Sequence, residues 1–136
     1  MPDRIEGIFD LLRSLDLPTA DHAVFGSGPL IVRGIVEPTN DLDVISRGAA
    51  WEVAAAAGDL EVLSDGAVIA AFFGGIITIG TRWAMGDFDL DELIDTSEMI
   101  EGIPFVLLKY VVAYKRFADR PKDRAHLASL AAWGHI

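Results

Sequence analysis

Apolar residues follow two different spacings in the first half of the chain. Short apolar runs between turn residues predict buried strands at 22–26 and 42–46. Pro29 suits the first turn of a helix, and Gly58 suits the residue after a helix end. Three segments are predicted to be helices. Residues 3–15 carry an apolar residue at every third or fourth position, residues 30–34 follow Pro29, and residues 49–57 are rich in alanine and are followed by Gly58.

The second half begins with β-branched and aromatic runs separated by glycine-containing turns. Asp65-Gly66 and Gly74-Gly75 are typical hairpin turns, so an antiparallel meander of three strands is predicted. Residues 87–101 contain seven acids and no base, which predicts a surface helix near the middle of this acidic stretch. The meander strands are expected at 61–64, 68–73 and 76–83. Two further helices are expected after the acidic stretch: one over 105–118, opened by Pro104, and one from Pro121 to Gly134.

This order of elements predicts the fold class. Helices and isolated strands alternate first, a meander follows, and helices end the chain. Such an order favours an α+β domain, with a mixed central sheet and a β-meander flanked by helices, over a doubly wound parallel sheet. A chain of 136 residues has the size of one domain, so residues 1–136 are expected to fold as a single unit.

The composition excludes several classes of site. The chain has no cysteine, which rules out a disulfide scaffold, a thiolate zinc site and a cysteine nucleophile. Its apolar runs are far shorter than the ~20 residues that cross a bilayer, so no membrane association is expected. The first residues carry acids among their apolar side chains and do not resemble a secretory signal, so a cytoplasmic protein is expected.

Charge is distributed unevenly along the chain, whose net charge is −10. Residues 1–101 contain 19 acids and 5 bases, whereas residues 102–136 contain 2 acids and 6 bases. The acidic majority argues against nonspecific binding to duplex nucleic acid, which depends on neutralising phosphates. The basic C-terminal part suits a small polyanion such as a nucleoside triphosphate, although attraction between the two halves also accounts for the asymmetry.

Two glycines flank Ser27 directly after the first predicted strand. The turn Gly26-Ser27-Gly28 lets backbone N–H groups approach a phosphate, and the N-terminus of the following helix favours negative charge. The same residues also fit an ordinary tight turn between a strand and a helix. Both interpretations therefore stay open at this stage.

Asp41 and Asp43 are separated by one residue at the start of the second predicted strand. Alternate strand residues point to one face, so the two carboxylates are expected side by side. Adjacent anions repel each other, and a divalent cation relieves this repulsion; hard oxygen ligands suit Mg²⁺. The alternative is one aspartate in a loop followed by another at an exposed strand end.

A basic corner joins the last two predicted helices. Residues 115–122 carry four cations, and Asp123 follows them in the first turn of the last helix. The corner suits phosphate binding, but it is also compatible with a solvent-exposed turn in which Asp123 interacts with the helix dipole. His126 is expected to form a local hydrogen bond with Asp123, which precedes it by three positions.

Together, these three motifs resemble those of the nucleotidyltransferase superfamily with the DNA polymerase β-like fold. In that family, a Gly-Ser turn after the first strand is followed by an Asp-x-Asp on the next strand, and here Ser27 precedes Asp41 by 14 residues. More narrowly, the segments PTNDLDVI and YKRFADRPKDRAHL resemble small bacterial proteins related to the AbiEii toxin group. The resemblance covers about residues 20–130 and implies a nucleotidyltransferase-like fold.

The resemblance also implies a role for each motif residue. Gly26 and Ser27 would hold the phosphates of a nucleoside triphosphate, and the catalytic Asp41 and Asp43 would bind Mg²⁺. Positioning and charge neutralisation are what phosphoryl and nucleotidyl transfer require. The remaining residues of the implied nucleotide-binding site form the basic corner: Lys115, Arg120, Lys122 and Asp123.

The sequence departs from the family pattern in three places. Glu37 stands near the position of an arginine, and His126 stands where a second aspartate often follows the Lys-Asp pair. The third departure is a missing acidic residue. Family members usually carry a third acidic residue on a later strand, beside the Asp-x-Asp, whereas the predicted strand 76–83 has none. Thr78 or Gly80 stands where that residue is expected. Asp87, after the strand, and Glu61, on a neighbouring strand, are the two candidate substitutes.

Two functional hypotheses follow, and the sequence leaves both open. The first is a Mg²⁺-dependent nucleotidyltransferase that moves a nucleoside monophosphate from a nucleoside triphosphate to an unknown acceptor hydroxyl. The second is a catalytically silent domain that binds a nucleotide or a partner protein, as in a toxin–antitoxin pair. A third interpretation gives Asp41 and Asp43 a purely structural role at an exposed strand end.

Overall fold

The computed structural model describes residues 4–39, 41–81 and 88–134. Within these ranges, no helix is both long and apolar enough to span a membrane. The helices are α1 (Arg4–Arg13), α2 (Gly28–Ile31), α3 (Gly48–Ala57), α4 (Leu90–Asp95), α5 (Leu108–Ala118) and α6 (Pro121–Trp133), with short 3-10 turns η1 (Thr19–Asp21) and η2 (Phe73–Gly75). The strands are β1 (His22–Val24), β2 (Leu42–Ser46), β3 (Asp59–Val62), β4 (Val68–Phe72), β5 (Ile77–Gly80), β6 (Glu98–Ile100) and β7 (Ile103–Phe105).

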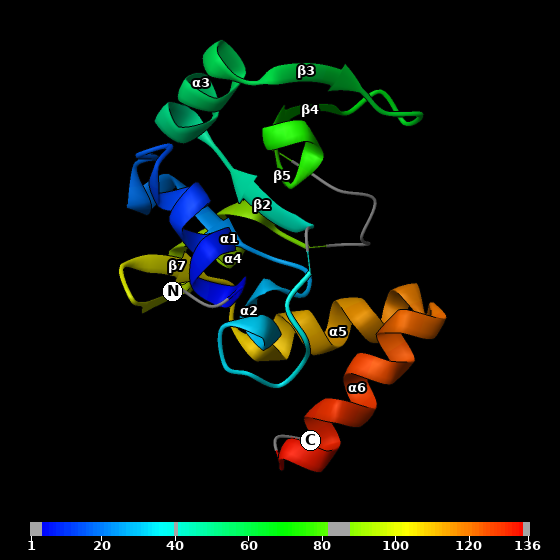
Figure 1. The fold of residues 1–136 in the computed structure, drawn as a ribbon. Helices are drawn as coiled ribbons and strands as arrows, with labels where there is room; N and C mark the ends of the chain where they lie inside the picture. The colour runs from blue at the N-terminus through cyan, green and yellow to red at the C-terminus, as the bar shows by residue number, and fades with distance from the viewer. Residues whose placement is uncertain (1–3, 40, 82–87, 135–136) are drawn as a thin grey trace.

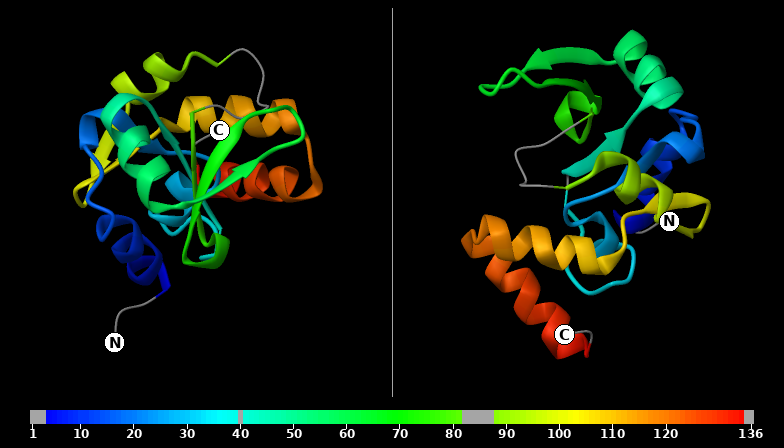
Figure 2. Two further views of the ribbon diagram at one scale, coloured as in Figure 1. Left: turned by 90° about the horizontal axis from the view of Figure 1, so that it is seen from above. Right: turned by 180° about the vertical axis from the view of Figure 1, so that it is seen from behind.

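The strands form one mixed sheet in the order β3-β4-β5-β2-β1-β7-β6. β3, β4 and β5 form the predicted antiparallel meander. β2 pairs in parallel with β5 and antiparallel with β1, and β1 pairs in parallel with β7. The predicted α+β class, with a mixed sheet flanked by helices, is therefore confirmed. β3 lies at one end of the molecule and α6 at the other in both the front and the rear view (Figures 1 and 2).

Hydrophobic side chains cover both faces of the sheet, and β2 contributes to each of them. Leu42 and Val44 pack with buried residues of α1 and α3 on one face. Ile45 packs with buried residues of α4, α5 and α6 on the other face. Because strand residues alternate between faces, Asp43 shares the face of Ile45. The carboxylate of Asp43 therefore lies on the side of the sheet that carries the basic C-terminal helices.

β7 lies where a helix was predicted. The prediction that Pro104 opens a helix over 105–118 was wrong, because Pro104 lies in β7 and α5 begins only at Leu108. Glu101 and Gly102 both have positive φ, 51° and 80°, and form the tight turn from β6 into β7. All three residues of β7 are buried between β1 and β6. Burial of this short apolar segment in the sheet outweighs the preference of proline for a helix start.

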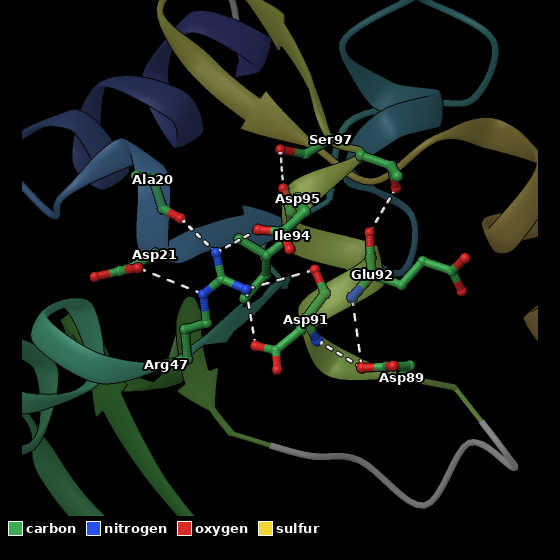
Figure 3. A network of polar contacts seen from close by, with 10 residues as sticks. Ala20, Asp21, Arg47, Asp89, Asp91, Glu92, Ile94, Asp95 and Ser97 are labelled. Atoms are coloured by element: carbon green, nitrogen blue, oxygen red, sulfur yellow. Dashed lines mark hydrogen bonds and ion pairs between the residues drawn. The ribbon is translucent and has the colours of Figure 1, made fainter.

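Arg47, which directly precedes α3, links this helix to η1 and to α4 (Figure 3). Its guanidinium donates to carboxylates of Asp91 and Asp95 in α4, at 2.8 and 2.6 Å, and lies 3.4 Å from that of Asp21 in η1. It also donates to the carbonyl oxygen of Ala20 at 3.0 Å. These hydrogen bonds raise the pKa of Arg47 further above its usual range. Two of the three acids of α4, Asp91 and Asp95, are thus paired with Arg47, which lies in the first half of the chain.

Replacing Arg47 with alanine is expected to lower the free energy of unfolding by about 1–3 kcal/mol, since three carboxylates lose a shared cation. The matched control is Arg124→Ala, which removes a cation from a single exposed pair with Asp119 and should cost less than about 1 kcal/mol. Urea denaturation of both variants measures the difference. Equal effects of the two substitutions would show that the Arg47 network adds nothing beyond an ordinary surface ion pair.

Candidate functional site

The turn after β1 has a backbone that only glycine accommodates easily. Gly26 has a φ of +62°, and a Cβ at this position would lie 3.2 Å from a carboxylate oxygen of Asp43. A Cβ on Gly28 would lie 2.2 Å from a methyl group of Val24. Ser27 caps α2 without using its side chain, so its hydroxyl is free to face elsewhere. The two glycines thus let the Ser27 turn fold tightly against the start of β2.

Asp41 and Asp43 flank the first residue of β2. Asp41 directly precedes the strand and is exposed, whereas Asp43 lies within it and is half-buried. The backbone N–H of Phe25 donates to the carbonyl oxygen of Asp43 at 2.9 Å, which extends the pairing of β1 with β2 into the Ser27 turn. This pairing fixes the two aspartates beside Gly26 and Ser27.

The two C-terminal helices bring the basic corner to the same place. α5 ends at Ala118, Asp119 adopts the left-handed conformation with a φ of 49°, and α6 begins at Pro121. This sharp turn brings Lys122, at the start of α6, onto the same cleft as Lys115, near the end of α5. Proline in the first turn, the acid Asp123 and Gly134 at the end explain why the bounds of α6 were predictable.

These segments enclose a cleft of about 230 Å³. Of the eight residues predicted to bind Mg²⁺ or the nucleotide, seven line this cleft, although they come from three separate parts of the chain. The lining residues are Gly26, Ser27, Thr39, Asp41, Asp43, Tyr114, Lys115, Arg120, Lys122 and His126. Asp41, Asp43 and Ser27 therefore meet at one cleft.

Asp123 is the one predicted site residue that does not line the cleft. It is fully buried, and its carboxylate accepts from the side chain of Arg120 at 2.7 and 3.1 Å and from the backbone N–H of that residue at 3.1 Å. Lys115, of which 1% is exposed, lies 3.5 Å from the same carboxylate. Burial raises the pKa of Asp123, but the hydrogen bonds from Arg120, together with the charges of Lys115 and Arg120, outweigh burial and hold the pKa below its usual value. Asp123 therefore positions two cations from beneath and does not itself offer a contact to phosphate.

Ser27 contacts both helices across the cleft. Its hydroxyl oxygen lies 3.4 Å from Nζ of Lys115 and 3.4 Å from Nδ1 of His126. The expected local hydrogen bond between His126 and Asp123 is not observed; His126 faces Ser27 instead, because the face of α6 that carries it turns toward the cleft. Three side chains with polar hydrogen-bonding atoms thus converge beside the glycine turn.

Burial changes the proton affinity of the groups in the cleft. Desolvation, and then the charge of Asp41, raise the pKa of Asp43 to about 6. Desolvation also lowers the pKa of Lys115, although Asp123 opposes this effect. The pKa of His126 is lowered by burial first and by the charge of Lys115 second, so its imidazole is neutral at pH 7. The cleft thus holds two carboxylates that repel each other and, opposite them, cations packed closely enough to repel one another.

No third carboxylate joins Asp41 and Asp43 in the described part of the chain. Thr78 of β5 is the residue in register with Asp43, and parallel register places both side chains on one face. Glu61 lies in β3, three strand spacings or about 14 Å from β2, which is too far to share a metal ion with Asp43. Asp87 lies outside the described residues. Across residues 4–39, 41–81 and 88–134, no group of three histidines or acids is arranged to hold a metal.

The donors that are present nevertheless fit one Mg²⁺ ion. Mg²⁺ commonly keeps several water molecules and takes only one or two carboxylates, with phosphate oxygens of a substrate completing its shell. Asp41 and Asp43 supply two such carboxylates, and the repulsion between them is relieved by a divalent cation. Mg²⁺ at this place would neutralise charge on a bound polyphosphate.

Three lining residues were not predicted as site residues: Thr39, Tyr114 and His126. The hydroxyl of Tyr114 accepts from Arg120 at 3.1 Å, and the guanidinium lies 5.6 Å from the centre of the same ring. Tyr114 directly precedes Lys115 and begins the segment YKRFADRPKDRAHL, so this motif already contained Tyr114 as a possible lining residue. His126 lies 99 residues from Ser27, and no local pattern connects the two.

The chain was compared with protein-family models, with curated proteins and with solved structures, and it matches none of them.

Proposed function

We propose that this chain is a nucleotidyltransferase-like domain that binds a nucleoside triphosphate with Mg²⁺ in the Ser27 cleft and transfers its nucleotidyl group to an acceptor hydroxyl. One observation carries the proposal: a single cleft places two carboxylates against three cations, with a glycine turn between them. This is the arrangement that a magnesium polyphosphate requires, because its metal and its phosphates need opposite charges at a fixed separation.

The phosphate side of the site consists of the Ser27 turn and the basic corner. The hydroxyl of Ser27 and Nζ of Lys115 are both directed at this part of the cleft. Arg120 is held by Asp123, so its guanidinium is positioned before a ligand arrives. A triphosphate is repelled by the acidic bulk of residues 1–101, and local cations offset that repulsion.

The acidic side of the site consists of Asp41 and Asp43, which would hold Mg²⁺ between the protein and the phosphates. Both groups must be ionised to bind a divalent cation, and the raised pKa of Asp43 makes this binding sensitive to acid. Holding the triphosphate against Ser27 while the metal screens its charge would expose the α-phosphate to an acceptor. Nucleotidyl transfer would then break the bond between the α-phosphorus and the pyrophosphate oxygen and form a bond from the α-phosphorus to the acceptor oxygen, whose proton would pass to water while pyrophosphate leaves.

A second candidate function is nucleotide binding without transfer. The observation that favours it is Thr78, which lies beside Asp43 where the family resemblance implies a third carboxylate. A threonine hydroxyl does not accept a proton from an acceptor near neutral pH as a carboxylate does. In this case, the domain would use the bound nucleotide to signal to, or to assemble with, a partner protein.

Replacing Lys122 with alanine is expected to weaken binding of Mg-ATP or Mg-GTP by about 10- to 100-fold, since one charge-assisted contact to phosphate is worth about 1.5–3 kcal/mol. Lys122 is preferred to Lys115 because Lys115 is buried against Asp123 and its loss also affects folding. Lys109→Ala, at an exposed site on α5 outside the cleft lining, is the matched control and should bind normally. Calorimetric titration measures all three proteins, and added salt should weaken the wild type more than Lys122→Ala.

Pyrophosphate release separates the two candidate functions. With water in place of the unknown acceptor, a transferase should release pyrophosphate slowly from Mg-ATP, and Asp43→Asn should abolish the release. Tight binding without pyrophosphate release would favour the silent domain. Failure of the wild-type protein to bind either nucleotide in the presence of Mg²⁺ would contradict both candidates.

A further inference from the structure

β3 is an edge strand at the end of the sheet remote from the cleft helices (Figure 1). Among the described residues, β4 is its only strand partner. All four residues of β3 are exposed, including Leu60 at 58% and Val62 at 69%. Exposed edge strands offer unpaired backbone groups to another chain, and proteins commonly block them with lysine, proline or a covering loop. β3 contains neither lysine nor proline.

Pairing with β4 determines which backbone groups of β3 are free. The N–H of Leu63 donates to the carbonyl oxygen of Ala67 at 2.8 Å, so the backbone of Leu63 faces β4. Backbone groups alternate along an antiparallel pair, which directs those of Glu61 toward β4 and those of Leu60 and Val62 outward. The outer edge of β3 therefore presents the N–H and C=O groups of Leu60 and Val62 for pairing.

The two faces of β3 differ in character. Leu60 and Val62 share one face, where Val62 lies opposite the partly exposed Val68 of β4. Asp59 and Glu61 share the other face, as alternation along a strand requires. Residues 48–81, which contain the whole meander, carry four acids and no base. A strand added at this edge would thus meet an apolar stripe on one side and an acidic stripe on the other.

A second copy of this chain fits the edge poorly. Two-fold antiparallel pairing keeps each face on its own side, so opposite residues must come from the same face. The two registers that pair three residues of β3 then place Glu61 against Glu61, or Asp59 against Glu61. Like charges directly opposite each other destabilise a strand pair. The charge pattern therefore favours a different, basic partner.

We propose that β3 is a docking edge for an extended segment of a partner protein in which basic and apolar residues alternate. The segment would add a strand beside β3, with its basic side chains against Asp59 and Glu61 and its apolar side chains against Leu60 and Val62. Main-chain hydrogen bonds supply affinity in this mode of recognition, and the alternating side chains supply specificity. The proposal does not depend on the activity of the cleft, because β3 contributes none of its lining.

A synthetic peptide with the sequence KVKVKVK, blocked at both ends, is the probe, and EVEVEVE is its charge-reversed control. The wild-type chain is expected to bind the lysine peptide at least about tenfold more tightly, and Glu61→Lys should reduce or reverse this preference, as a lost ion pair does. Val62→Pro removes an outward N–H without removing a hydrogen bond to β4, so it should also weaken binding. Hydrogen exchange should show protection of the Leu60 and Val62 amides when the lysine peptide is bound.

Three results would overturn the proposal. Equal affinity for both peptides would show that the acidic face of β3 does not select the partner, and protection at amides outside β3 would show that general electrostatic attraction holds the lysine peptide elsewhere. A concentration-dependent dimer that Val62→Pro disrupts would assign the edge to a second copy of the chain. Because Val62→Pro strains the backbone, thermal unfolding checks that it folds, and Glu61→Lys, at an exposed site, tests the same surface independently.

Discussion

Replacing Asp123 with asparagine is expected to lower the free energy of unfolding by about 3–5 kcal/mol, the usual effect of removing one partner from a buried ion pair. The carboxylate is fully buried, and it accepts from Arg120 while lying 3.5 Å from Nζ of Lys115. The NH₂ group of an asparagine would face the N–H groups of Arg120 or Lys115, so donor would meet donor. The buried ammonium of Lys115 would also lose its counter-charge. The C-terminal corner therefore depends on this one carboxylate.

Asp119→Asn is the matched control for this experiment. It makes the same substitution at the same helix corner, but Asp119 is 60% exposed and pairs with the exposed Arg124, so its loss should cost less than about 1 kcal/mol. Urea denaturation at pH 7 measures both variants, and nucleotide titration of Asp123→Asn should show weaker binding because Lys115 and Arg120 lose their support. Similar stability losses for the two variants would contradict a special role for the buried carboxylate.

The pKa of Asp123 adds a pH dependence to the same prediction. Because the folded-state pKa lies below the ordinary value of 3.8, the stability that Asp123 contributes is present above that value. It is lost as the pH falls through the folded-state pKa. The difference between wild type and Asp123→Asn should therefore be full at pH 7 and shrink in strong acid.

Local patterns in the sequence predicted most of the elements around the cleft, and the reason differs between them. β2 was predicted with its observed bounds because its apolar run lies between polar turn residues. α6 was predictable because proline opens it and glycine ends it. β7 was missed because its three residues give too short a pattern, and Pro104 carries a local helix signal that the sheet overrides.

The candidate site depended on a family resemblance, since its parts are distant in sequence. Ser27 and Lys115 are 88 residues apart, and periodicity alone does not bring them together. The resemblance joined the three motifs into one site but assigned Asp123 to nucleotide binding, whereas its burial and its ion pairs place it beneath the cleft, beside the cations. His126 was missed as a lining residue because its position is decided by how α6 packs against the Ser27 turn.

Strand register, which the sequence does not specify, decides which residue occupies the position where the family resemblance implies a third carboxylate. Thr78 was one of two positions considered, and its pairing with Asp43 selects it over Gly80, which pairs with Ile45. The same register removes Glu61 from consideration, because it lies in a strand that is separated from β2 by β4 and β5. Single-residue slips in such pairings move side chains to the opposite face, so composition alone does not settle the choice.

Replacing Asp43 with asparagine is expected to stabilise the metal-free protein at pH 7 by up to about 3 kcal/mol, since folding raises the pKa of this carboxyl group from 3.8 to about 6. A carboxyl group whose pKa is raised on folding binds more protons in the folded than in the unfolded state. Its contribution to stability therefore falls as the pH rises from about 4 to about 6. The advantage of the asparagine variant should be full above this range and absent below it.

The same substitution should abolish the effect of Mg²⁺ on nucleotide binding, because it removes one of two carboxylates and the charge that attracts the ion. Asp41→Asn is the companion variant: Asp41 is exposed, so it should lose Mg²⁺ binding with little gain in stability. Removing its charge should also lower the pKa of Asp43 toward the ordinary value. Thermal unfolding at about pH 3 and about pH 7.5, below and above the range in which Asp43 titrates, with and without Mg²⁺, compares the three proteins. A loss of stability in Asp43→Asn that is the same with and without Mg²⁺ would mean that the aspartate supports the fold and does not hold a metal.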